Sequence, residues 1–88
     1  MITIQAFSDI INAELVIRRY PNQDNRWTAD FDGCEIKGDG VLESAYGDGT
    51  TAAAAIAAYV ERIRGKTLVF NATTDRRREY VVPIDIEI

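Results

Sequence analysis

Histidine is absent from this chain of 88 residues, and cysteine occurs once. Without histidine, the protein lacks the usual general base, the commonest metal ligand and the side chain that titrates near neutral pH. Cys34 has neither a histidine to activate its thiol nor a second cysteine for an internal disulfide, and a zinc site would lack its preferred ligands. These absences predict a non-catalytic protein without a metal or other cofactor. An enzyme that uses carboxylates alone is the remaining catalytic alternative.

Long hydrophobic runs and a basic leader are also missing. The longest apolar run, residues 52–60, is rich in alanine and too short to span a bilayer. The first nine residues contain no lysine or arginine, so no secretory signal is indicated. A single cysteine fits a reducing compartment. The sequence therefore predicts a cytoplasmic protein that makes no use of a membrane.

Positive charge is in the minority, with 10 basic against 14 acidic residues and a net charge of −4. Binding to duplex nucleic acid depends on neutralising phosphates with lysine and arginine, so this balance argues against it. It permits binding to a basic protein surface, or binding of a small anion in a local arginine pocket. Hydrophobic residues make up 47% of the chain and charged residues 27%, which predicts one folded domain over residues 1–88.

Apolar residues alternate with polar ones over much of the chain and follow a helical period in one segment. The segment 52–64 carries an apolar stripe at helical spacing, with a capping threonine before it and a glycine after it. The expected strands are 13–21, 26–32, 41–46, 66–72 and 78–83. The order β-β-β-α-β-β predicts an α+β domain in which one helix packs on an antiparallel sheet of about five strands.

Turn signals and chain ends leave some choices open. The apolar residues occupy odd positions before residues 32–33 and even positions after them, which predicts a bulge or a turn at 32–33. The segment 37–40 predicts a hairpin turn. Residues 1–12 fit either helix or strand. The three isoleucines of the terminal segment 84–88 recur with period two and need covering, either by the N-terminal segment or by another chain.

Three consecutive arginines, Arg76, Arg77 and Arg78, are the strongest candidate for a binding site. On a strand, the first and third would point one way and the second the other. Guanidinium groups bind phosphate or carboxylate bidentately, which favours an anion site. The alternative is a solvated hairpin that discourages edge pairing, with ion pairs to Asp75 and Glu79.

The segment YGDGTT, residues 46–51, precedes the expected helix. Its Gly47 and Gly49, with Thr50, can present backbone N–H groups to an anion, assisted by the helix dipole. A tight turn with a capping threonine is the alternative, and Asp48 would repel a phosphate held close. Tyr46 fits a ring that stacks on a base, or a core residue with its hydroxyl at the surface.

Other polar and aromatic residues carry weaker signals. Asn71 is expected on a strand, where it either contacts a ligand or bonds the following turn. Trp27, the one tryptophan, is expected to pack under the helix. Asp30 and Asp32, near Glu35, form an acidic cluster without recognisable metal-ligand spacing, so a solvated face is expected.

Three stretches together resemble a known family: RWTADFDGCEIK, then LESAYGDGTTAAAAIAAYVERIRGKTLVFNA, then RREYVVP. This order is similar to small phage and prophage proteins, among them the first family of Thoeris anti-defence proteins, over about residues 26 to 83. The resemblance implies a protein in the cytoplasm of an infected bacterium. Such a protein sequesters cyclic ADP-ribose signals, or cyclic oligonucleotides, without cleaving them.

A second resemblance leads to a different function. The strand, the GDGT segment and the alanine-rich helix are also similar to HicB-type antitoxins, which implies binding to a toxin. A protein-binding inhibitor with an acidic surface is therefore the alternative to a nucleotide sponge. The sponge hypothesis predicts a homo-oligomer with its pocket between subunits. The residues expected to bind the nucleotide are Tyr46, Gly47, Gly49, Thr50, Asn71, Arg76, Arg77 and Arg78.

Overall fold

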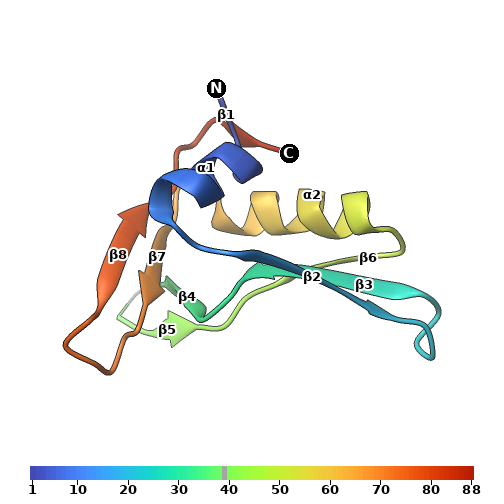
Figure 1. Cartoon of the computed structure of the whole chain (residues 1–88), viewed down its shortest axis with the longest axis horizontal. Helices are drawn as coiled ribbons and strands as arrows, with labels where there is room; N and C mark the ends of the chain where they lie inside the picture. Colours follow the sequence, from blue (N-terminus) through green and yellow to red (C-terminus); the bar gives the residue numbers. More distant parts are fainter. Residues whose placement is uncertain (39) are drawn as a thin grey trace.

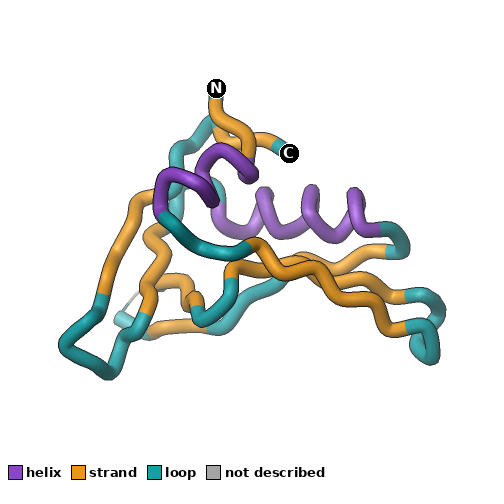
Figure 2. The backbone as a smooth tube through the Cα atoms, in the orientation of Figure 1, coloured by secondary structure: helices purple, strands orange, loops and turns teal. Residues whose placement is uncertain are grey.

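The computed structural model describes residues 1–38 and 40–88, and these form an α+β fold with two helices. The expected fold class is confirmed. Helix α2 lies along a long antiparallel hairpin, and shorter strands gather at one end of the molecule (Figures 1 and 2). The helices are α1 (Ile4–Ile11) and α2 (Ala52–Ile63). The strands are β1 (Ile2–Thr3), β2 (Leu15–Tyr20), β3 (Arg26–Phe31), β4 (Cys34–Lys37), β5 (Leu42–Glu43), β6 (Gly47–Gly49), β7 (Thr67–Phe70), β8 (Arg78–Val81) and β9 (Ile86–Glu87).

The described strands form three small sheets rather than one. The first has the order β2-β3-β6 and the second β5-β4-β7-β8, both antiparallel, while β1 and β9 pair in parallel. The chain passes from the first sheet to the second at Asp32 and Gly33, where Gly33 has a φ of +68°. The change of apolar parity at 32–33 therefore marks a real turn, as expected.

Of the expected strand at 41–46, only Leu42–Glu43 form a strand, β5, which pairs with β4 of the second sheet. Residues 44–46 belong to no strand, and the next paired segment is β6, which begins at Gly47 and pairs with β3 of the first sheet. The amide of Gly38 donates to the carbonyl of Val41 at 2.8 Å, as in the hairpin turn expected at 37–40; Asp39 of that turn lies outside the described residues. A continuous strand was a wrong prediction because alternation alone does not identify the neighbouring strand.

Helix α2 packs on the first sheet through two glycines. A Cβ atom on Gly47 would overlap the carbonyl oxygen of Ala55, and one on Gly49 would lie 2.7 Å from the Cβ of Ala54. No larger side chain fits between helix and strand at this separation. The Thr51 hydroxyl caps the helix by accepting from the amide of Ala54 at 3.0 Å.

The core lies between α2 and the covered face of the first sheet, and it extends to buried residues of α1, β4, β7 and β9. Its helix residues are Ala55, Tyr59, Val60 and Ile63, close to the expected apolar stripe. The buried ring of Phe31 meets Tyr59 edge-on at 5.7 Å between centroids, and the Phe31 amide donates to the Tyr59 hydroxyl at 3.1 Å. This bond satisfies the tyrosine hydroxyl in an apolar setting.

The N-terminal segment, which the sequence left open, contains helix α1. The Thr3 hydroxyl caps it, and Ile4, Phe7 and Ile11 are buried. The two chain ends lie side by side (Figure 1), where Ile2 of β1 is paired with Ile86 of β9. The terminal isoleucines are therefore covered in part by the N-terminal segment: Ile86 is buried, whereas Ile84 and Ile88 are exposed. No described helix has the length and apolarity needed to cross a bilayer.

Candidate functional site

Helix α2 covers one face of the first sheet, and the other face carries polar and aromatic side chains. Cross-strand partners share a face, and the strand register sets Arg18 opposite Thr28 and Thr28 opposite Asp48. Trp27 and Ala29 belong to the face that α2 covers. We call the uncovered side the open face. Its residues are Val16, Arg18, Tyr20, Arg26, Thr28, Asp30, Tyr46 and Asp48.

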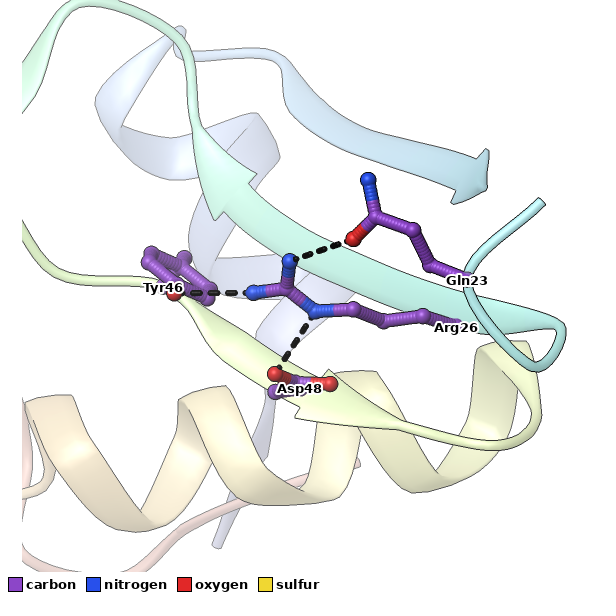
Figure 3. Close-up of polar contacts among 4 residues, drawn as sticks. All are labelled: Gln23, Arg26, Tyr46 and Asp48. Carbon is purple, nitrogen blue, oxygen red and sulfur yellow. Dashed lines mark hydrogen bonds and ion pairs between the residues drawn. The ribbon is translucent and has the colours of Figure 1, made fainter. Parts of the chain in front are cut away.

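Arg26 connects the strands of the open face (Figure 3). Its guanidinium donates to the carboxylate of Asp48 at 2.8 Å, the hydroxyl of Tyr46 at 2.8 Å and the Gln23 side-chain oxygen at 3.3 Å. The same group lies 5.3 Å from the Tyr46 ring centroid and 5.8 Å from that of Tyr20. Asp48 is the main cause that raises the pKa of Arg26. Arg26 thus fixes the Tyr46 ring and neutralises the charge of Asp48.

A second charged pair, Arg18 and Asp30, lies on the same face. The closest nitrogen and oxygen are 3.6 Å apart, and the Arg18 side chain is 52% exposed. Burial raises the pKa of Asp30, Arg18 lowers it, and Asp32 raises it again. An exposed pair at this distance contributes little free energy. Arg18 can therefore turn to another anion at small cost.

Three shallow hollows meet at Tyr46, whose side chain is 46% exposed. The sheet hollow, of about 260 Å³, is lined by Arg18, Tyr20, Arg26, Thr28, Asp30 and Tyr46. The turn hollow, of about 380 Å³, is lined by Asp30, Gly33, Cys34, Glu35, Ser44, Ala45 and Tyr46. The helix hollow, of about 490 Å³, is lined by Tyr46, Asp48, Ala58 and Arg62. A ligand that stacks on Tyr46 can reach into each of them.

The three arginines of the last hairpin lie elsewhere and do not converge. Arg76 and Arg77 precede β8 and are exposed, and the Arg77 guanidinium donates to Glu79 at 3.0 Å. Arg78 lies over the rings of Phe70 and Tyr80, at 5.3 and 5.6 Å from their centroids. None of these arginines lines the hollows described here.

The arginine run is also not a strand of three residues. The alternation that a strand would give these side chains does not apply, because only Arg78 belongs to β8, which begins where the strand at 78–83 was expected to begin. Its guanidinium donates to the carbonyl of Ile11 at 3.5 Å and to the hydroxyl of Tyr80 at 3.2 Å, so it connects α1 to the second sheet. Asn71 follows β7 with a φ of +55°, and its amide donates to the carbonyl of Arg76 at 3.4 Å. This is the bond across the turn that the sequence offered as an alternative.

The YGDGTT segment separates into residues with different positions. Gly47 and Gly49 pair with β3 and face α2, so the structure gives them a packing role. Thr50 is exposed, and Thr51 caps the helix. Tyr46 is the expected ligand residue of this segment that lies at the hollows.

Arg18, Tyr20, Arg26 and Asp30 were not among the expected site residues. The signal was present, because the alternation in RWTADFD already set Arg26, Thr28 and Asp30 on one face. What the alternation lacked was the register that brings β2 and β6 alongside β3. Trp27, expected under the helix, is half-buried, and its cross-strand partner Gly49 packs against the first turn of α2. The Arg19 guanidinium lies 5.7 Å from the centroid of the Trp27 ring.

Neither metal binding nor thiol chemistry finds support in the described side chains. No three Asp, Glu or Cys residues among them gather as metal ligands would, so the acidic residues near Asp30 form no such cluster. Burial raises the pKa of the Cys34 thiol to about 11. The thiol therefore remains protonated at neutral pH and is a poor nucleophile.

Comparisons with protein-family models, with curated proteins and with solved structures gave no match for this chain.

Proposed function

We propose that the protein is a non-catalytic binder that holds a cyclic nucleotide on its open face and thereby withholds the signal from bacterial immunity. The observation that carries the proposal is the exposed Tyr46 ring, fixed by Arg26 at the meeting point of three hollows. A base stacks on an immobilised aromatic ring with a favourable free energy of about 1–3 kcal/mol.

The other residues of the sheet hollow match the remaining parts of a nucleotide. Arg18 is exposed and weakly held, so its guanidinium can bind a phosphate. The Asp30 carboxylate and the Thr28 hydroxyl can accept hydrogen bonds from ribose hydroxyls or from an exocyclic amine. Arg26 keeps Asp48 neutralised, which removes the repulsion that this carboxylate would exert on a phosphate.

The cyclic ADP-ribose class and the anti-defence role rest on the family resemblance over residues 26–83. On that basis, the protein acts in the cytoplasm of an infected bacterium and releases its ligand unchanged. Chromatography of the ligand recovered after denaturing the complex tests this last point. A cleaved product would contradict sequestration.

Calorimetry with cyclic ADP-ribose isomers and cyclic di- and trinucleotides tests the binding. We expect micromolar or tighter affinity for one of these ligands, loss of binding in Tyr46→Ala, and nearly full binding in Tyr46→Phe, which keeps the ring. Arg76→Ala is the matched control, because this exposed arginine lies outside the hollows. Absence of binding to all these ligands, or equal loss in Tyr46→Ala and Arg76→Ala, contradicts the proposal.

A protein partner is the second candidate, and the composition of the open face favours it. Tyrosine and arginine dominate the contact residues that contribute most to protein interfaces, and Tyr20, Tyr46, Arg18 and Arg26 lie together here. An inhibitor or HicB-like antitoxin would use this face against a basic protein, which the chain's net charge of −4 would attract. An affinity pull-down from bacterial lysate distinguishes the two. A stoichiometric protein lost with Tyr46→Ala supports this candidate, and a small molecule absorbing near 260 nm supports the first.

A further inference from the structure

Asp30 and Tyr46 are the two residues that line both the sheet hollow and the turn hollow. A planar base that stacks on the Tyr46 ring in either hollow therefore lies beside the Asp30 carboxylate. This carboxylate is loosely paired, because its closest oxygen is 3.6 Å from the Arg18 guanidinium. Burial raises the pKa of Asp30, so the ionised carboxylate has lost part of its water. Hydrogen-bond donors of a ligand can replace that water.

The charges around the Tyr46 ring differ from side to side. The turn hollow has the carboxylates of Asp30 and Glu35 in its lining, and no lysine or arginine is among the described residues that line it. The sheet hollow contains Arg18, and the helix hollow contains Arg62. A phosphate is repelled by the two carboxylates and attracted by the two arginines. The base is therefore the part of a nucleotide that fits the acidic side of the ring.

We propose that the open face selects guanine nucleotides and that the Asp30 carboxylate recognises the base by accepting hydrogen bonds from its N1–H and 2-amino groups. An ionised carboxylate only accepts hydrogen bonds, and it can accept two in parallel. Guanine presents two adjacent donors on one edge and so matches both carboxylate oxygens. Adenine, cytosine and uracil each place an acceptor beside their donor group, and this acceptor is repelled by the second oxygen.

This inference rests on the proposed function, because it uses the stacking of the base on Tyr46. It also narrows the ligand. Among cyclic nucleotides, those that contain guanine should bind more tightly than those that contain only adenine, cyclic ADP-ribose included. The phosphates of such a ligand then lie toward Arg18 or Arg62, on the other sides of the ring.

Calorimetry with two sets of probes tests the selection. The first set is guanosine, inosine and adenosine 5′-monophosphate, and the second is cyclic di-GMP, cyclic di-AMP and cyclic ADP-ribose. In each set we expect the guanine nucleotide to bind roughly tenfold to a hundredfold more tightly than the adenine nucleotides. Inosine monophosphate should fall between, because its base keeps N1–H and lacks the 2-amino group. Equal affinities for guanine and adenine nucleotides overturn the inference.

Asp30→Asn distinguishes recognition of the base from a structural role. The new amide turns an N–H group toward the guanine donors, whereas asparagine pairs well with adenine. The preference for guanine should therefore disappear or reverse. Asp75→Asn is the matched control, because Asp75 is an exposed carboxylate of the last hairpin that lines none of the three hollows. It should keep the preference, and circular dichroism checks that both variants are folded. A guanine preference that survives Asp30→Asn, or affinities for both bases that fall by the same factor, overturns the inference.

The outcomes also separate this inference from the proposed function. Tighter binding of cyclic di-AMP or cyclic ADP-ribose than of cyclic di-GMP contradicts guanine selection alone. Binding of guanosine monophosphate, without binding of any cyclic nucleotide, supports the guanine site and contradicts the proposed function alone. Absence of binding to all six probes contradicts both.

Discussion

The open face and the last hairpin both contain arginines beside aromatic rings, but they use them differently. On the open face, Arg26 joins Tyr46, Asp48 and Gln23, and the hollows open around this group. At the hairpin, Arg78 is held by Phe70, Tyr80 and Ile11, while Arg76 is exposed and Arg77 forms an exposed ion pair with Glu79. A run of arginines in the sequence is therefore less informative than single arginines that meet across strands.

The largest expected difference between the regions concerns ligand affinity. Arg26→Ala releases the Tyr46 ring and leaves the charge of Asp48 without its partner beside the ligand, so we expect the affinity to fall roughly tenfold to a hundredfold. Arg76→Ala should leave it unchanged. Calorimetry with the best cyclic nucleotide measures both. A larger loss of affinity with Arg76→Ala would show that the ligand binds at the last hairpin and not on the open face.

Within the last hairpin, Arg78 should contribute more to the free energy of unfolding than Arg77 does. Arg78→Ala removes contacts with two rings and a bond to the Ile11 carbonyl, and we expect it to lower the free energy of unfolding by about 1–2 kcal/mol. Arg77→Ala breaks an exposed ion pair, so its effect should stay within about 0.5 kcal/mol. Urea unfolding monitored by circular dichroism compares them. Equal effects would contradict the structural role of Arg78.

The smallest expected difference concerns how stability depends on pH, because Glu79 in the last hairpin and Asp30 on the open face should give dependences of opposite sign. The Arg77 hydrogen bond, with Lys37, holds the pKa of Glu79 below its ordinary value of 4.5. This contribution to stability is present above pH 4.5 and is lost as the pH falls through the lowered pKa. Burial raises the pKa of Asp30 above 3.8, so ionisation of Asp30 lowers stability as the pH rises through the raised pKa.

Two variants separate these contributions. Glu79→Gln should flatten the acid-side fall in unfolding free energy, whereas Asp30→Asn should remove a loss that appears as the pH rises from 3 to 7. Urea titrations at a series of pH values measure both slopes. Changes of the same sign in the two variants would show that the two carboxylates have similar surroundings.

Much of the fold was predictable because its signals are local. The apolar stripe and capping residues of α2, the alternation of β3 and the break at Gly33 all depend on near neighbours in the chain. The α+β class followed from these elements. The division of residues 41–49 between two sheets was missed, since it depends on which strand lies alongside.

The candidate site was predicted less well, because it depends on register. Tyr46 was expected to bind a ligand and lies at the three hollows, but its neighbours Arg18, Tyr20 and Arg26 come from other strands. Gly47 and Gly49 were read as part of an anion loop, and only the contact with α2 gives them a packing role. An anion site was predicted at the three arginines because they are consecutive in the sequence, but their spacing does not determine where each side chain points.

By itself, the sequence determined the absence of histidine chemistry, the helix α2 and the polar and apolar faces of β3, because composition and periodicity are properties of neighbouring residues. The tertiary structure alone decided that Arg26 meets Tyr46 and Asp48 and that Arg78 supports α1. These contacts join residues 20 to 67 positions apart, and their formation depends on how the bend at Gly33 and the packing of α2 on Gly47 align the strands.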